Sequence, residues 1–203
     1  MPTDDATAVP DGAALGREGA YAKGVARRRE ILDRAITVFA ERGASGASLR
    51  SIARALDVSH AALLHYFDSR EQLLVAVYDH AARQMASATE LGPVEGLTHA
   101  ASRNVAVPGL VELYSTLVAN ALESDSDAAR GFIARRFADL RVQLAAQLRA
   151  EQAAGTVRGD VDADEIAALL IAASDGLQIQ WLLEPAVALE RTLGAFGTLL
   201  APR

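Results

Sequence analysis

The chain has 203 residues, half of them hydrophobic, with no cysteine, four histidines and a formal net charge of −6. This composition predicts a globular core, and it excludes a disulfide framework and a thiolate metal site. The first twenty residues lack the basic start and hydrophobic stretch of a secretory signal, and the longest apolar run, 166–173, is too short to span a bilayer. We therefore expect a cytoplasmic protein without a membrane partner.

The charge is unevenly distributed along the chain. Residues 17–70 contain ten Arg or Lys against six acids, whereas residues 71–203 contain ten Arg against seventeen acids. A basic part of this kind attracts the phosphate backbone of nucleic acid, so 17–70 is the expected DNA-facing part. An arginine-rich solvated surface is the alternative interpretation.

The chain begins with a segment, 1–24, that mixes Pro, Gly, Asp and small residues without periodicity. This composition predicts a disordered tail, because too little apolar surface can be buried to offset the entropy of ordering. From Val25 the apolar residues recur with a helical period, and Gly43 is the expected stop of this first helix.

Two short helices are expected next, over 49–56 and from Ser59 to about Tyr66, with Ser48 and Ser59 as their N-caps. Ser69 is the expected cap of a fourth helix, which ends near Met85. Further helices are predicted in the C-terminal half, over 94–103, 109–123, 127–154, 164–183 and 186–200. The expected fold is all-α with about nine helices, because no segment alternates for long enough to make a strand.

The two short helices between Ser48 and Phe67 are separated by a turn of only a few residues, as in a helix-turn-helix. Small or apolar side chains are spaced to converge on the first helix: Ile52, Ala53, Leu56, Val58 and Leu63. The second short helix would then lie in the major groove of DNA, with side chains near its start reaching base edges. A generic helical hairpin inside a bundle is the alternative.

Positive and polar side chains surround this motif. His65, Tyr66 and Arg70 adjoin the start of the fourth helix, which predicts a phosphate clamp. The arginine run 27–29 forms a second basic patch on the first helix.

The motif as a whole resembles the DNA-binding domain of the TetR family. The similarity covers about 25–85 and is carried by Ser48-Leu49-Arg50-Ser51-Ile52-Ala53, Val58-Ser59, Leu63, His65-Tyr66-Phe67 and Arg70-Glu71-Gln72-Leu73-Leu74. The resemblance implies a three-helix DNA-binding domain (25–88), joined by the fourth helix to a C-terminal domain (89–203) that dimerises and often binds a small effector. The residues expected at or near DNA, from the resemblance and the pattern together, are Arg28, Ser48, Arg50, Ser59, His60, Ala62, His65, Tyr66 and Arg70.

The motif departs from the family pattern at the turn and on the base-reading face. Asp57 stands where glycine is usual, and since Asp tolerates left-handed backbone, the turn is expected to survive. His60, Ala62 and Leu64 replace the family's frequent Lys, Thr and Tyr. We expect part of the operator to be read through methyl contacts to thymine.

The last two predicted helices are more apolar than a surface helix requires, and small residues along them permit close approach. They are expected to pair with their copies in a four-helix dimer interface, with an ordinary intrachain core as the alternative. The residues assigned to this interface are Leu169, Ala173, Gly176, Leu189, Leu193 and Phe196.

An effector pocket is expected among the helices between residues 107 and 181, although each wall residue also fits a plain core. The apolar residues assigned to its wall are Leu113, Leu117, Phe132, Phe137, Leu140, Leu177 and Trp181. Arg135, Arg136 and Asp175 are the polar candidates. The expected effector is small and apolar or amphipathic.

The sequence offers little support for catalysis or for a bound cofactor. The acidic string 160–164 imitates the start of a calcium loop, but Glu165 replaces the required glycine, so helix capping explains it better. We expect no metal, no cofactor and no enzymatic activity. The predicted function is a homodimeric repressor that binds a palindromic operator and is released by a small effector. The alternatives are a DNA-binding regulator that has no effector or is controlled by a protein partner, and a small-molecule-binding protein that has lost DNA binding.

Overall fold

The computed structural model describes residues 12–42, 49–84, 91–123 and 127–203, and in the first helix it describes side chains from Gly24 onward, residues 40 and 42 excepted. Within these ranges the chain forms nine α-helices and no strand, as predicted. They are α1 (Gly12–Arg42), α2 (Leu49–Ala55), α3 (His60–Tyr66), α4 (Arg70–Gln84), α5 (Pro93–Ala106), α6 (Leu110–Glu123), α7 (Asp127–Ala154), α8 (Ala163–Leu183) and α9 (Leu189–Leu199).

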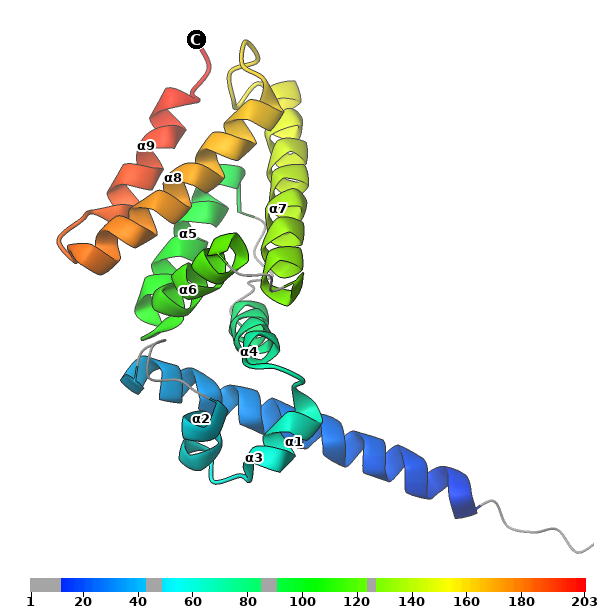
Figure 1. The fold of residues 1–203 in the computed structure, drawn as a ribbon. Helices are drawn as coiled ribbons and strands as arrows, with labels where there is room; N and C mark the ends of the chain where they lie inside the picture. Colours follow the sequence, from blue (N-terminus) through cyan, green and yellow to red (C-terminus); the bar gives the residue numbers. More distant parts are fainter. Residues whose placement is uncertain (1–11, 43–48, 85–90, 124–126) are drawn as a thin grey trace, which may run out of the picture.

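Helices α1 to α3 form a small unit beneath a larger bundle of α5 to α9, and α4 lies between the two (Figure 1). The small unit closes over apolar side chains from each of its helices. Leu63 of α3 and Ile52 of α2 are completely buried, and they belong to one hydrophobic cluster with Ile31, Ala35 and Phe39 of α1. The converging positions predicted from the motif are therefore confirmed as a core.

The hydrophobic core continues from the small unit through α4 into the bundle. On α4, Leu73, Leu74 and Val77 are completely buried in the same cluster as Leu113 and Leu117 of α6. Tyr78, one residue further along α4, stacks on Tyr114 of α6 with ring centroids 5.3 Å apart. Because α4 is buried in both parts, a shift of α4 relative to the bundle must also move the small unit.

The bundle is built on the long helices α7 and α8, with α5 and α9 packed beside α8 (Figure 1). Besides the part of the first cluster that reaches α6, its core contains two clusters of its own. One lies between α7 and α8 around Leu148 and Leu170. The other lies between α5, α8 and α9 around Leu189, Leu193 and Ala101.

The first helix starts much earlier than predicted. α1 begins at Gly12, so the disordered tail expected over 1–24 was wrong for residues 12–24, and residues 1–11 lie outside the described part. The segment 13–23 contains Ala, Glu, Arg and Lys, which are good helix formers, and extending an existing helix requires no new nucleus. This part of α1 projects beyond the other helices in Figure 1.

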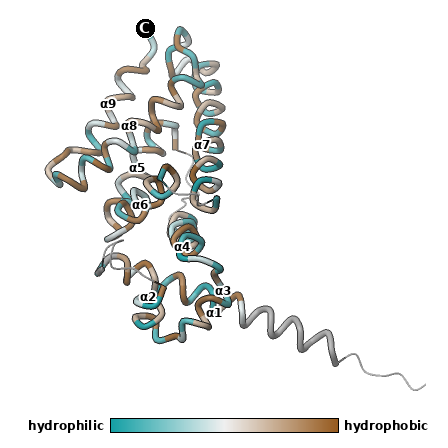
Figure 2. Tube along the Cα trace, in the orientation of Figure 1, coloured by the Kyte–Doolittle hydropathy of each residue, from teal (hydrophilic) through white to brown (hydrophobic). Residues whose placement is uncertain are grey.

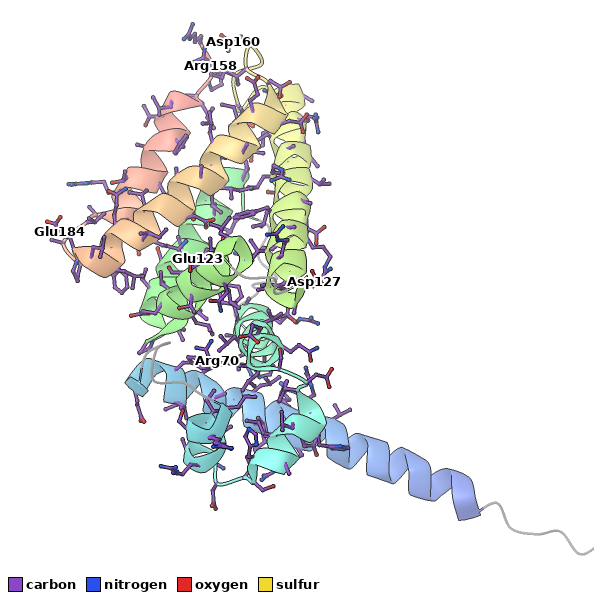
Figure 3. All side chains as sticks on the ribbon, in the orientation of Figure 1. Arg70, Glu123, Asp127, Arg158, Asp160 and Glu184 are labelled. Atoms are coloured by element: carbon purple, nitrogen blue, oxygen red, sulfur yellow. The ribbon has the colours of Figure 1, made fainter. Side chains whose placement is uncertain are left out.

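The acidic string between α7 and α8 acts as a helix cap, as predicted. Oδ1 of Asp162 accepts from the backbone N–H groups of Asp164 (2.8 Å) and Glu165 (3.0 Å) at the start of α8. Asp160 forms a two-pronged ion pair with Arg158, both contacts being 2.6 Å, at the end of α8 opposite Glu184 (Figure 3). No group of three metal-ligating side chains occurs among the described residues.

By length and composition α8 is long and apolar enough to cross a membrane, and a bent pair formed by α5 and α6 passes the same test jointly with a 103° bend. Figure 2 shows strongly hydrophobic stretches along α8. Its middle nevertheless carries Asp175 and Gln178, which hydrogen-bond to other helices of the bundle. These contacts identify α8 as a core helix with one apolar face turned outward.

Candidate DNA-binding surface and effector cavity

The turn between α2 and α3 is made by Asp57, whose φ of 54° lies in the left-handed region. The Asp57 N–H donates to the carbonyl of Arg54 (3.2 Å), and the Val58 N–H donates to the carbonyl of Ala53 (3.0 Å). These two bonds form a Schellman motif, which normally has glycine at the left-handed position. The expectation that Asp57 preserves the turn is confirmed.

Helix α3 has a defined start because Ser59 caps it. The Ser59 Oγ accepts from the backbone N–H of Ala62 at 3.0 Å, as predicted for an N-cap. Leu63 faces the core, which turns the opposite side of α3 to solvent. The exposed side chains there are Ala61, Leu64 and His65, while His60 and Ala62 are half-buried.

The start of α4 is fixed by a second cap. The Ser69 Oγ accepts from the N–H of Gln72 (3.1 Å), and the Gln72 side chain in turn accepts from the N–H of Asp68 (3.1 Å). This reciprocal pairing resembles a capping box and holds Arg70 at the first position of α4, where α4 meets the small unit (Figure 3). Unlike exposed arginines elsewhere on the small unit, Arg70 is half-buried.

Aromatic and cationic side chains lie close to this junction. The rings of His65 and Tyr66 make an edge contact with centroids 5.2 Å apart, and Tyr66 also packs on the core. Arg28 of α1 covers the Phe67 ring at 4.9 Å. The structure thus holds Arg28 and Tyr66 in place by contacts with the core, and the phosphate clamp proposed from the sequence stays a prediction.

The remaining predicted DNA-facing residues lie on α2 or just before it. Arg50 is exposed on α2, whereas Ser48 lies outside the described residues. Arg54 was missed by the sequence reasoning: it is exposed four residues after Arg50, so both guanidinium groups extend from the same side of α2. Ala61 was also missed, because the sequence pattern alone did not distinguish it from the less exposed Ala62.

A cavity of about 160 Å³ lies inside the bundle. Four helices supply its wall: Tyr78 and Ala82 from α4; Leu97, Ala100, Ala101, Arg103 and Asn104 from α5; Arg136 and Leu140 from α7; and Ile171, Ser174, Asp175 and Gln178 from α8. Two grooves adjoin this inner cavity. One lies between α4 and α7 and shares Arg136, and the other lies between α5 and α7 and shares Arg103.

Only some of the residues assigned to an effector pocket line this inner cavity. Leu140, Arg136 and Asp175 do, while Phe132 and Arg135 line the outer groove between α4 and α7. The other assignments were wrong for the inner cavity, because their side chains pack into the hydrophobic clusters instead: Leu113, Leu117, Phe137, Leu177 and Trp181. A helical period identifies an inward face without showing whether that face meets a cavity or another side chain.

Two polar side chains of the inner cavity, Asp175 and Gln178, accept hydrogen bonds from neighbouring side chains. The Tyr114 hydroxyl donates to Oδ2 of Asp175 at 2.8 Å, and the Asn104 amide donates to Oε1 of Gln178 at 2.9 Å. Burial raises the pKa of Asp175, although the hydrogen bond from Tyr114 and the charge of Arg136 both act in the opposite direction. Asp175 therefore releases its proton less readily than an exposed aspartate.

The outward face of α8 carries an apolar stripe with alternating spacings of three and four residues. It consists of Leu169, Ala172, Gly176, Ile179 and Leu183. Leu169, Ile179 and Leu183 expose 56%, 47% and 84% of their surface, which is high for large apolar residues. We call these five residues the α8 stripe.

The interface residues assigned from the sequence divide between the α8 stripe and the interior. Leu169 and Gly176 belong to the stripe. Leu189 and Leu193 pack against α5 and expose only 4% and 1% of their surface. Their assignment to the interface was therefore wrong. Ala173 and Phe196 are half-buried and pack against the chain's own core clusters. The apolar side of α9 faces α5 of the same chain. A helical period in the sequence shows that a helix has an apolar side, but it does not show whether that side faces another helix of the chain or a second copy of the chain.

The small unit matches a known family model, and most of the chain matches known repressors. The model of the family described as bacterial regulatory proteins, tetR family, matches residues 31–77, which run from α1 into α4. The HTH-type transcriptional repressor Rv1474c of Mycobacterium tuberculosis is 33% identical over 154 residues, covering 75% of this chain and 80% of the relative. The repressor AcnR of Corynebacterium jeikeium is 29% identical over 154 residues, covering 74% of this chain and 79% of the relative.

Solved structures share the fold over almost its whole extent. A TetR regulator from Haloarcula marismortui aligns with a TM-score of 0.71 at 18% identity, covering 87% of this chain and 97% of that one. A TetR-family regulator from Rhodococcus sp. aligns with a TM-score of 0.70 at 23% identity, covering 86% and 98%. Members of the family bind DNA operators and act as dimers. The chain therefore belongs to the TetR family and is a DNA-binding transcriptional repressor.

Proposed function

We propose that this repressor acts in the cytoplasm as a homodimer on a palindromic operator and that a small effector releases it. The observation that carries the proposal is the position of α4, which is buried both in the small unit and against the bundle that contains the cavity. A ligand that favours one position of α4 thereby favours one placement of α3.

On the DNA side, α3 would enter the major groove with Ala61, Leu64 and His65 toward the bases. Arg50 and Arg54 of α2 would lie against the phosphate backbone. The exposed alanine and leucine supply methyl groups and no hydrogen-bond donor, which favours thymine-rich steps. This assignment changes the one made from the sequence. It adds Ala61 and Arg54, moves His65 from the phosphate clamp to the base-reading face, and leaves out the half-buried His60 and Ala62.

The dimer is supported by the α8 stripe. Spacings of three and four residues place its members along one seam of a helix, as in helices that pack side by side. A Cβ added to Gly176 meets no atom within 4 Å in the chain itself, so the backbone there is open to the approach of a second helix. A copy of α8 would cover Leu183 and Ile179, which are otherwise unusually exposed.

The decisive experiment asks whether DNA binding depends on the α8 stripe and the dimer that it would form. Ile179→Arg places a charge within the α8 stripe. We expect light scattering after size exclusion to show a monomer, and we expect this monomer no longer to form a specific complex with DNA from the region upstream of its own gene. Val142→Arg on α7 is the matched control, because Val142 is also an exposed apolar residue (70%) and lies off the stripe. An Ile179→Arg protein that remains a dimer with unchanged operator affinity would contradict the proposal.

Release by an effector is tested on the same complex by fluorescence anisotropy at constant ionic strength. A compound supports the proposal if it lowers operator affinity in the wild type and binds the free dimer more tightly than the DNA-bound dimer, because only a difference in affinity shifts the equilibrium. The solved neighbour from Saccharomonospora viridis is in complex with choline, which shows that a small molecule binds one regulator of this fold. A saturable ligand that leaves operator affinity unchanged would refute effector release by that ligand.

A further inference from the structure

The inner cavity contains more positive than negative charge. Arg103 enters its wall from α5 and Arg136 from α7, while Asp175 is the only acid among the described residues that line it. Even a fully ionised Asp175 therefore leaves a net positive lining. Electrostatics in such a site favours an anion over a neutral or cationic ligand.

Each of these arginines has a buried hydrogen-bond donor for which the described part of the chain supplies no acceptor. The Nε atoms of Arg103 and Arg136 are buried, and neither finds an acceptor among the described residues. Buried donors without partners are rare in folded proteins. Each Nε would gain an acceptor if its side chain turned toward an acid group bound in the cavity. A carboxylate matches a guanidinium well, because its two oxygens accept the parallel N–H bonds of the arginine fork.

The surroundings of Arg136 link this site to the DNA-binding part. Its guanidinium lies 5.3 Å from the ring centroid of Tyr78 on α4 and 5.4 Å from that of Tyr114 on α6. A ligand that pulls Arg136 toward itself would alter the packing of Tyr78 and hence of α4. The Tyr114 hydroxyl already donates to Asp175 and is therefore engaged within the protein.

The cavity volume limits the size of the ligand. A cavity of about 160 Å³ accommodates roughly six to ten non-hydrogen atoms, because one of about 150 Å³ holds benzene. Leu97, Leu140 and Ile171 supply apolar wall beside the two arginines. This combination suits a short hydrocarbon chain that ends in an acid group.

We infer that the inner cavity binds a small organic carboxylate, with Arg103 and Arg136 holding the acid group and the apolar wall holding the carbon chain. The inference rests on the proposed effector function and names the chemical class of the effector. Both arginines act as binding residues, and the contact between Arg136 and Tyr78 carries the signal to α4.

The test is calorimetric titration of the DNA-free dimer with two acids, succinate and hexanoate, and with their neutral amides, succinamide and hexanamide. We expect saturable binding of at least one acid and affinity for its amide lower by about tenfold or more. Arg103→Gln and Arg136→Gln should each weaken that acid by about tenfold or more, whereas Arg141→Gln, an exposed arginine on α7, should not. Arg103→Lys, which keeps the charge, should lose less than Arg103→Gln.

Circular dichroism and size exclusion first establish that each variant is folded and dimeric. Absence of saturable binding of both acids up to about 10 mM overturns the inference. Equal affinity for acid and amide also overturns it, as does wild-type acid affinity in both glutamine variants. A parallel anisotropy titration of the operator complex separates this result from the proposed function. Acids that bind through the arginines without releasing DNA support the cavity site and contradict effector release, whereas release by an unrelated compound with no acid binding contradicts the cavity site alone.

Discussion

Replacing Arg50 with alanine tests the placement of α2 against the DNA backbone. Arg50 is exposed near the start of α2, and its side chain has no role in the hydrophobic core. A lysine or arginine that contacts a phosphate releases condensed counterions, and this release sets the salt dependence of binding. Because the dimer contains two copies of α2, each substitution removes two phosphate contacts from the complex.

The magnitude follows from this symmetry. With a slope of about −0.9 per phosphate contact, loss of two contacts should make the plot of log affinity against log salt shallower by about 1.8, and it should weaken binding about 30-fold near 0.15 M salt. The measurement is a salt titration of fluorescence anisotropy on operator DNA and on a scrambled duplex. Both duplexes should weaken by the same factor, since a phosphate contact carries no sequence information.

Two comparisons make the result decisive. Arg141→Ala on α7 also removes one exposed positive charge, and it should leave the slope unchanged because α7 lies in the bundle. Leu64→Ala on α3 should weaken the operator complex alone and leave the slope unchanged. An Arg50→Ala protein with the wild-type slope would refute the proposed orientation of α2.

Three further predictions concern stability and are measured by urea or thermal unfolding at fixed dimer concentration. Asp57→Ala should cost about 1 kcal/mol because alanine tolerates φ of 54° less well than aspartate, and Asp57→Gly should stay within about 0.5 kcal/mol of the wild type; equal losses would contradict the turn argument. Leu63→Ala should cost about 2–5 kcal/mol because Leu63 is completely buried, whereas Leu64→Ala on the exposed side should cost less than about 0.5 kcal/mol. Burial raises the pKa of Asp175, so its contribution to stability is complete below the unfolded pKa near 3.9 and is lost as the pH rises through the folded pKa. The melting temperature of Asp175→Asn minus that of the wild type should therefore increase as the pH rises from about 4 to 7. A difference that decreases over this range would contradict the raised pKa.

The helix ends could be predicted where a single side chain determines them. Ser59 and Asp162 cap α3 and α8 as expected, because a short oxygen-bearing side chain acts on backbone groups only two or three residues away. The range predicted for α7, 127–154, matches the structure. The start of α1 could not be predicted in the same way, since the extension from Gly12 depends on a helix already nucleated further along the chain.

The sites that depend on tertiary packing were predicted less well. Leu189 and Leu193 have the spacing of an interface helix, but their partner is α5, more than eighty residues earlier in the chain. Arg136 was named as a polar candidate, whereas Arg103 was missed because only the packing of α4, α5, α7 and α8 brings it to the same cavity. Hydrophobic periodicity reports that a side chain faces inward, and it contains no information about which helix lies opposite.

Because Ser59 caps α3, the formation of α3 and the binding of DNA can influence each other. Its oxygen accepts the Ala62 N–H, while the hydroxyl hydrogen can still be donated outward. A phosphate that takes this hydrogen bond would polarise the hydroxyl and strengthen the cap that it already supplies. Because α3 has only seven residues, it depends on such terminal contacts for its stability. If bound DNA stabilises the first turn of α3, thermodynamic linkage requires the reverse effect as well. A chain in which that turn is already formed binds DNA more tightly.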